Sequence, residues 1–592
     1  MINKAGKVMK RIRQGEGFIG VYHHKGDKFI LYPLFRYDSG PIEINPIPEA
    51  EEADIVRVWS ENGDTFASLF HKKETLLYRY FMELNSLRIN PFFPQEALEE
   101  VKAILENPGI DDSQLLDYTD LPFVTIDNEG SRDLDQAIYV EDYESGFKIY
   151  YAIADASYYI KPGSALFTEA LRRGASYYFP DYSVPMLPRE LSEGIISLNP
   201  VEPRRCLMFL MEVDQKGIVV KTDIFRAKII SRAKLSYSEV QRFYDGEETS
   251  FLDAPFSQSL FALEKVGALL AERGDDRGII SYQRHENEIH ISEDGTSLVV
   301  KGNSRNNASR WNEQISILCN LEGAKILSDV FNSMHIQPIF RVHDAPTEES
   351  LKHLELVIAD FIKIHNLDET VFSWKREESL SSYLKRLHAS GESKRIIDAI
   401  ERQILISNNK SYFTDMPGSH FALGAKFYGR FSSPMREIVG IFTHKELTEK
   451  LGMQKPLPDE EDIELRKKVI LASNRSKDIQ KEIDNFVNSL VIESLFKEDL
   501  MTSASTRRVH KGTILGMKDS KLYVLLDDPA IEIKIYMEDI ERFFCQKFIF
   551  KPYEMVDDEN NPSIRIKAGS LISFRLHSFD KDYKWRFTDF SL

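Results

Sequence analysis

The sequence predicts a multidomain α+β protein in which a central mixed α/β domain lies between two small OB-type β-barrels. A chain of 592 residues is longer than one hydrophobic core usually serves. Short strand-like runs separated by turns occupy both ends of the chain, a pattern typical of small barrels. Between them, strand-like and helix-like segments alternate over residues 112–499, as in one large α/β or α+β domain.

The first two zones are predicted from their hydrophobic periodicity. Residues 1–73 contain the strand-like runs "GFIGVYHHKGDKFILYPLF" and "TFASLFH", which predict a barrel. Residues 74–111 contain "ETLLYRYFMELN" and "PQEALEEVKAILEN", whose apolar residues recur at helical spacing. We therefore expect a helical linker between the first barrel and the central domain.

The central and last zones are predicted in the same way. In residues 112–499, "FKIYYAIADASYYI" reads as a strand and "RSKDIQKEIDNFVNSLVIESLF" as an amphipathic helix, with "PDEEDIELRKK" as a solvated helix start. Residues 500–592 return to short strands such as "SLISFRLHSF", which predict the second barrel.

Composition excludes several classes of protein. Three widely spaced cysteines form no CxxC or Cys/His pattern, which argues against a zinc or redox centre. No run of about 18 apolar residues predicts a membrane span, and the basic start has no apolar signal core, so we expect a cytoplasmic protein without a membrane partner. The net charge of −17 does not itself suggest nucleic acid, but local patches can still bind it.

One short stretch, "VTIDNEGSRDLDQAIYV", carries the clearest chemical signal. Asp127, Asp133 and Asp135 fall within nine residues, around a turn-like "NEGS". If residues 133 and 135 lie on a strand, their side chains face the same side. Clustered carboxylates are unfavourable without a cation, and oxygen ligands suit Mg²⁺, with Mn²⁺ as the other candidate. A solvated acidic loop is the alternative that composition alone leaves open.

Seven segments in order resemble the catalytic domain of the ribonuclease II/ribonuclease R family of 3′-to-5′ exoribonucleases, also called the RNB-domain family. They span residues 121–496 and include "TIDNEGSRDLDQAIYV", "YYAIADASYYIKPGSAL", "SYYFPDYSVPMLPRELSEGIISLNP", "RAKLSYSEVQ", "RGII", "IFRVHDAP" and "HFALGAKFYGRFSSPMREIVGIFTH". The resemblance implies a cold-shock-like barrel before this RNB domain and an S1-like barrel after it. The first zone has room for one barrel, where the best-known members have two.

The resemblance also implies roles for matching residues. It implies that Asp127, Asp133 and Asp135 bind Mg²⁺, with Asp135 the carboxylate most needed for chemistry. Arg436 matches the arginine that grips the scissile phosphate, and Glu482 matches a glutamate near the end of the domain. Two tyrosines complete the implied set as a clamp that stacks on the 3′-terminal bases of RNA: Tyr178 and Tyr282. The histidines His343, His420 and His444 and Arg341 are expected to be structural.

The sequence departs from the family pattern close to these residues. The fourth acidic position is Gln136, and Glu437 and Gly440 replace a basic residue and an aspartate. Two hypotheses follow. In the first, the chain is a monomeric Mg²⁺-dependent exoribonuclease that degrades single-stranded RNA processively to nucleoside 5′-monophosphates. In the second, it is an RNA-binding protein of the same fold with weak or lost catalysis. Under the first hypothesis, an aspartate at position 136 should raise activity.

Overall fold

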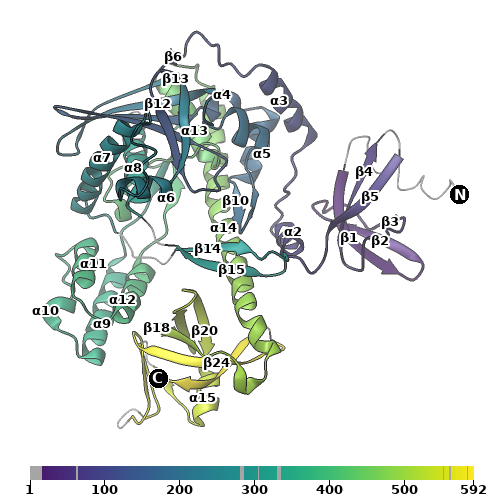
Figure 1. Cartoon of the computed structure of the whole chain (residues 1–592), viewed down its shortest axis with the longest axis vertical. Helices are drawn as coiled ribbons and strands as arrows, with labels where there is room; N and C mark the ends of the chain where they lie inside the picture. The colour runs from purple at the N-terminus through teal and green to yellow at the C-terminus, as the bar shows by residue number, and fades with distance from the viewer. Residues whose placement is uncertain are drawn as a thin grey trace.

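The computed structural model describes residues 17–592, except 62–63, 281–285, 304–305, 330–334, 551–552, 559–561 and 583. A central α/β body carries one small β-sheet unit at its side and another below it, and a single long helix runs from the body to the lower unit (Figure 1). Among the described residues, no helix is both long and apolar enough to cross a bilayer.

Five antiparallel strands form the N-terminal sheet in the order β3-β2-β1-β4-β5. Their alternating pattern buries one set of side chains, including Phe18, Leu31 and Val58, in a small core of their own. Gly20 is required where β1 meets β2, because a Cβ there would lie 2.6 Å from the Tyr32 carbonyl oxygen. The strands are β1 (Gly17–Lys25), β2 (Lys28–Pro33), β3 (Ile42–Ile44), β4 (Ile55–Glu61) and β5 (Asp64–His71).

The residues predicted as a helical linker form two helices, α2 (Leu76–Ser86) and α3 (Gln95–Glu106). The Thr75 hydroxyl caps α2 by accepting from the Tyr78 amide. Tyr80 is fully buried in a core shared with the central body, and its ring centroid lies 4.7 Å from that of Phe179. The linker is therefore packed against the central body along α2.

The central domain is organised around a mixed six-stranded sheet in the order β12-β9-β8-β7-β13-β6, and an additional β12–β13 pairing joins its two sides. One core includes side chains of α5 and α13, and the other includes side chains of α7 and α8. The strands are β6 (Leu116–Asp117), β7 (Phe123–Asp127), β8 (Gln136–Tyr143), β9 (Gly146–Ala154), β12 (Pro203–Asp214) and β13 (Val219–Ser236).

Helices and short hairpins complete this domain. The helices are α4 (Ala156–Tyr159), α5 (Ala165–Arg173), α6 (Tyr237–Tyr244), α7 (Ser257–Asp276), α8 (Asn307–Ser328), α9 (Glu348–His365), α10 (Glu369–Phe372), α11 (Leu380–Ala389), α12 (Lys394–Ser407), α13 (Ile438–Lys450) and α14 (Asp459–Met501), with short turns η1 (Glu190–Ile195) and η2 (Phe421–Leu423). The hairpin strands are β10 (Tyr177–Phe179), β11 (Tyr182–Val184), β14 (Glu286–Ile291), β15 (Leu298–Asn303), β16 (Phe340–Val342) and β17 (Tyr412–Thr414).

The start of α14 corrects one sequence expectation. The stretch "PDEEDIELRKK" begins a helix, but Asp462 within it is only 1% exposed and is not a solvated residue. Its carboxylate bonds Lys445 of α13, which a composition pattern cannot show.

The C-terminal unit contains a five-stranded antiparallel sheet, ordered β20-β19-β18-β24-β25, and a three-stranded one. It is anchored to α12 by ion pairs from Arg395 to Asp527 at 2.7 Å and from Arg402 to Glu532 at 3.0 Å. Its elements are η3 (Ala504–Thr506), β18 (His510–Lys518), β19 (Lys521–Leu526), β20 (Glu532–Tyr536), α15 (Met537–Phe544), β21 (Ile549–Phe550), β22 (Glu554–Val556), β23 (Arg565–Lys567), β24 (Leu571–Phe579) and β25 (Trp585–Ser591).

Candidate active site

The acidic stretch forms a loop between two strands of the central sheet. Strand β7 ends at Asp127 and β8 begins at Gln136, so Asp133 and Asp135 lie in the loop between them. Their spacing had suggested instead that they lie on a strand. The Ser197 hydroxyl accepts from the Leu134 amide at 2.9 Å and holds the end of this loop in place. Backbone position, and not strand alternation, therefore directs these carboxylates.

Asp135 and Arg436 form the centre of the site. The Arg436 Nε donates to Asp135 Oδ2 at 2.7 Å, and the Met435 amide donates to Asp135 Oδ1 at 3.0 Å. Asp135 is 2% exposed. Burial raises its pKa to about 6, against the opposing effect of the Arg436 guanidinium, and the nearby Asp133 carboxylate raises it further. Both oxygens of Asp135 are thus occupied by protein donors in this structure.

Asp127 and Asp133 are both partly exposed beside this ion pair. Burial also raises the pKa of Asp133 above its usual value. Asp127 Oδ1 accepts from the Asn128 amide at 2.8 Å, and Asp127 acts electrostatically on the phenol of Tyr237 in α6. Carboxylate oxygens suit a hard divalent cation, but in this structure the three aspartates do not each place an oxygen within 4.8 Å of the others. Their role as Mg²⁺ ligands together with Asp135 stays a prediction.

The loop that carries Arg436 is joined to the strand that carries Tyr178. The Ser176 amide donates to the Arg436 carbonyl at 2.9 Å, and residues 175 and 437 form an isolated β-bridge. Glu437, one of the departures from the family pattern, accepts from Arg430 Nε at 2.9 Å. In this chain an acid at that position is therefore balanced by a neighbouring arginine.

Gln136 has a definite structural role. Its Nε2 donates to the Ser432 carbonyl at 2.5 Å, and its Oε1 accepts from the Tyr151 hydroxyl. The amide therefore ties β8 to the loop that precedes Arg436, across 296 residues of sequence. Both ends of the amide are thus bonded to protein groups, and neither is a free ligand for a metal beside the aspartates.

Replacing Gln136 by aspartate is expected to destabilise the protein, because a carboxylate cannot donate to the Ser432 carbonyl. Leaving that acceptor unpaired should lower the free energy of unfolding by roughly 1–3 kcal/mol. Thermal unfolding of Gln136→Asp measures the loss, with Asp142→Asn on the exposed end of the same strand as the control. Unchanged stability together with faster RNA cleavage at low Mg²⁺ would instead make position 136 a metal ligand.

The structure describes two of the three remaining predicted residues, Tyr178 and Glu482. Tyr178 is 44% exposed, and its backbone amide and carbonyl pair with the Gln480 side chain of α14 at 3.1 and 3.2 Å. Arg436 and Asp133 act electrostatically on its hydroxyl, in opposite directions. Tyr282 lies outside the described residues. Gln480 was not predicted, because a side chain that clamps a backbone 302 residues away leaves no local sequence signal.

Glu482 is exposed on α14. Burial raises the pKa of Glu83 in α2, and the like charge of Glu482 adds to that effect. Glu482 thus faces the linker helix, and its assignment to catalysis stays a prediction.

The histidines expected to be structural make backbone contacts. His343 Nε2 lies 2.7 Å from the Asn409 carbonyl, and His444 Nε2 lies 2.8 Å from the Phe431 carbonyl. Burial lowers the pKa of His444 to about 4, so its ring is neutral at neutral pH. These contacts brace the segment that leads to Arg436.

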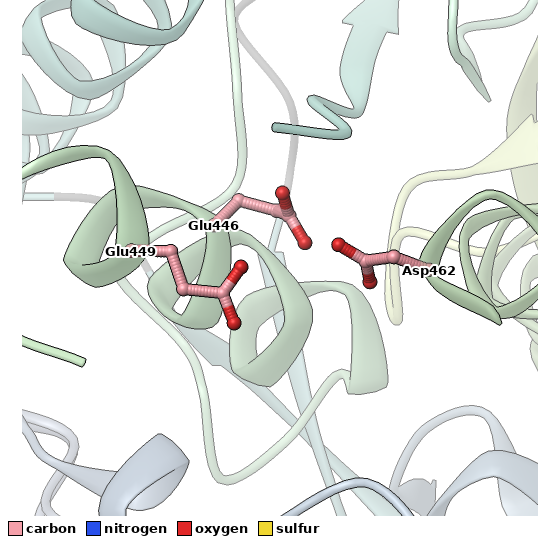
Figure 2. A group of neighbouring side chains, drawn as sticks. All are labelled: Glu446, Glu449 and Asp462. Carbon is pink, nitrogen blue, oxygen red and sulfur yellow. The ribbon is translucent and has the colours of Figure 1, made fainter. Parts of the chain in front are cut away.

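A second acidic group lies away from these residues, between α13 and the start of α14. Glu446, Glu449 and Asp462 point toward one another (Figure 2), and within the described ranges they are the one trio of potential ligands with atoms all within 4.8 Å. The Lys445 ammonium occupies the space between them, 2.6, 2.9 and 2.8 Å from the three carboxylates. Burial raises the pKa of Glu446 to about 8, and the adjacent Asp462 adds to this. An internal lysine thus supplies the cation here.

Lys445→Met is expected to lower the free energy of unfolding by roughly 3–5 kcal/mol, because it leaves buried carboxylates without their cation. Lys450→Met, at the exposed end of the same helix, is the matched control and should change stability little. Chemical denaturation of both variants gives the comparison. If Lys445→Met is as stable as the control in the absence of divalent ions, the lysine does not hold this group together.

Comparison with known proteins identifies the family of the central domain. Residues 115–452, more than half of the chain, match the family described as "RNB domain". Ribonuclease R of Escherichia coli is 26% identical over 524 residues, which cover 86% of this chain and 61% of that protein. Ribonuclease R of Mycoplasma genitalium is 26% identical over 78% of this chain and 62% of its own length. The chain therefore spans about three fifths of these relatives.

Solved structures share the fold. Mycoplasma genitalium RNase R in complex with ribose methylated single-stranded RNA has a TM-score of 0.78 at 21% identity, over 97% of this chain and 90% of that one. Yeast Ssd1, a pseudonuclease, has a TM-score of 0.60 at 13% identity, over 95% of this chain and 68% of that one. The same fold is thus found both in an RNase R bound to RNA and in a protein described as a pseudonuclease.

Proposed function

The chain belongs to the RNB domain family, and on that premise we propose that it is a metal-dependent 3′-to-5′ exoribonuclease. Its substrate is single-stranded RNA, which it shortens processively to nucleoside 5′-monophosphates in RNA turnover. The observation that carries the proposal is the Asp135–Arg436 pair, held beside two further aspartates and within electrostatic reach of an exposed tyrosine.

In this proposal some site residues bind the metal or the phosphate, and Asp135 also orients Arg436. Asp127 and Asp133, with Asp135, would hold Mg²⁺ or Mn²⁺, which when bound supplies an activated water and neutralises the leaving oxygen. Arg436 binds the scissile phosphate through the fork of its guanidinium and stabilises the charge that develops on the phosphate oxygens. Asp135 orients Arg436 through the 2.7 Å bond to its Nε.

RNA is held by stacking as well as by charge. Tyr178, 44% exposed, offers a ring face to the 3′-terminal base, and Gln480 fixes the backbone from which that ring projects. On the N-terminal sheet, Trp59 and Phe66 stack at 5.6 Å, and Phe66 is 42% exposed. Such rings bind bases of any sequence, as a processive enzyme requires. We take the working form to be a cytoplasmic monomer.

An RNA-binding protein without catalysis is the second candidate, because Gln136 stands where the family has an acid and its amide is committed to Tyr151 and Ser432. The fold itself does not separate the two, since it is shared with yeast Ssd1. The retained Asp135–Arg436 pair favours the enzyme.

A cleavage assay with 5′-labelled single-stranded RNA tests the proposal. With Mg²⁺ or Mn²⁺, the wild-type chain should produce a ladder that shortens from the 3′ end, and EDTA should stop it. Binding of the RNA without any shortening, even in excess Mn²⁺, would favour the second candidate.

A further inference from the structure

We propose that a cavity at the end of the central body opposite the C-terminal unit binds the phosphate of a nucleoside 5′-monophosphate, and this inference rests on the proposed function because that nucleotide is its product. The cavity has a volume of about 330 Å³ and is bordered by β6, α4, β12 and β13. Those elements lie at the end of the body opposite the C-terminal unit (Figure 1). Its size suits one small ligand and not a polymer.

The cavity wall carries an excess of positive charge. Lys161, Arg205 and Arg226 line it, and the carboxylates that pair with the two arginines are Asp112 and Asp155. Three cations against two carboxylates leave one positive charge. Within the part of the chain that the structure describes, Lys161 has no carboxylate partner, and it lies 5.4 Å from the centre of the Tyr158 ring. A phosphate dianion would supply the missing negative charge.

The two arginines form a buried ion-pair group with Asp155. Both are largely buried, with side chains 1% and 13% exposed, and the Nε atom of each is buried without a hydrogen bond among the described residues. Arg226 Nε lies 3.0 Å from Asp155 Oδ2, but the two are not aligned as donor and acceptor. Asp155 Oδ2 is also buried without a hydrogen bond among these residues, so both Nε atoms face the carboxylate of their own ion pair, and the positive charge left for an anionic ligand is that of Lys161.

The walls that bear these cations are tightly built. The Arg205 guanidinium lies 3.5 Å from the centre of the Tyr158 ring and donates to the Gly109 carbonyl at 2.6 Å. Gly109 has φ +64°, and a Cβ there would lie 2.3 Å from the Tyr158 hydroxyl. Tyr158, Phe225 and Leu116 add apolar surface beside the cations. Cationic groups next to an apolar wall match a phosphate joined to a nucleoside.

Contacts between protein groups connect the arginines of the cavity to the candidate active site. Asp155 follows Ala154, whose amide donates to the Asp135 carbonyl at 2.8 Å. On the other side, Asp155 and Arg226 both act electrostatically on His444, which contacts the Phe431 carbonyl. The carboxylate that pairs with the two cavity arginines is therefore one residue from the strand whose end bonds Asp135.

Isothermal titration of the full chain in EDTA tests the inference, since no RNA is turned over under these conditions. The probes are adenosine 5′-monophosphate, inorganic phosphate and adenosine. We expect the monophosphate to bind and adenosine to bind at least about tenfold more weakly, because it lacks the charge-assisted contacts. Lys161→Gln should weaken binding of the monophosphate by about tenfold. Leu116→Trp, which fills the cavity from its rim, should also weaken this binding.

The matched control is Lys148→Gln, because Lys148 lies 5.6 Å from the Tyr143 ring in a similar cation–aromatic pair outside the cavity. It should bind the monophosphate like the wild type. Equal affinity in wild type, Lys161→Gln and Leu116→Trp would overturn the assignment, as would no binding to wild type or tight binding of adenosine. Binding of inorganic phosphate without binding of adenosine 5′-monophosphate would overturn the assignment of a nucleotide as the ligand. If the protein shortens RNA but does not bind the monophosphate in the cavity, this inference fails and the proposed function stands. If the protein binds the monophosphate in the cavity but does not shorten RNA, only the proposed function fails.

Discussion

Asp135→Asn should abolish RNA cleavage while RNA binding survives. Asparagine removes the negative charge that accepts from Arg436 Nε at 2.7 Å and that helps to hold a divalent cation. The amide can still accept from the Met435 amide, so the loop keeps its shape. Loss of both the orientation of Arg436 and a ligand charge should reduce kcat by more than about a thousandfold.

Two measurements separate chemistry from binding in this variant. Single-turnover cleavage in Mg²⁺ gives the rate, and fluorescence anisotropy of labelled RNA in EDTA gives the affinity. Asp142→Asn is the control, because Asp142 lies on β8 but pairs with Lys265 at the surface. A near-normal rate for Asp135→Asn would refute the assignment of this carboxylate.

Arg436→Lys should reduce kcat by about 10²- to 10³-fold with little change in RNA affinity. Lysine keeps one positive charge opposite the buried Asp135, so the protein should fold. It lacks the planar fork that can bond Asp135 and a phosphate at the same time. Burial by itself would lower the pKa of Arg436, but the acids around it, first Asp135, raise it, so the native side chain stays charged throughout the pH range of the assay.

The matched control for this variant is Arg232→Lys, since Arg232 is exposed and bonds the Thr119 carbonyl at 2.6 Å. It should cleave RNA at the wild-type rate. If Arg436→Lys loses RNA affinity and keeps its rate, Arg436 binds substrate without stabilising the transition state.

The main elements of the fold were predictable because each depends on local periodicity. The short apolar run in "GFIGVYHHK" produces β1, whose residues 18–22 are all buried, and helical spacing in residues 76–86 produces α2. The assignment to a mixed α+β protein with a central RNB domain is confirmed by the family match. The domain boundaries remain predictions. The burial of Asp462 was missed because its partner, Lys445, lies on another helix.

The candidate site was predicted in part, for a similar physical reason. Residue types and motif order pointed to Asp135 and Arg436, and the structure brings these two together across 301 residues. The roles of Gln136 and Gln480 could not be predicted, because each amide bonds a backbone group about 300 residues away. The cavity cations Lys161, Arg205 and Arg226 converge only after β13 has crossed back beside β12.

The most direct test of the central claim is the identity of the first product. Single-stranded RNA labelled at its 3′-terminal nucleotide is mixed with wild-type protein and Mg²⁺, and the label is followed by chromatography within the first turnover. The account predicts that the label leaves at once as a nucleoside 5′-monophosphate, and that Asp135→Asn releases none. Label that stays on full-length RNA, or that first appears in longer fragments, would contradict it.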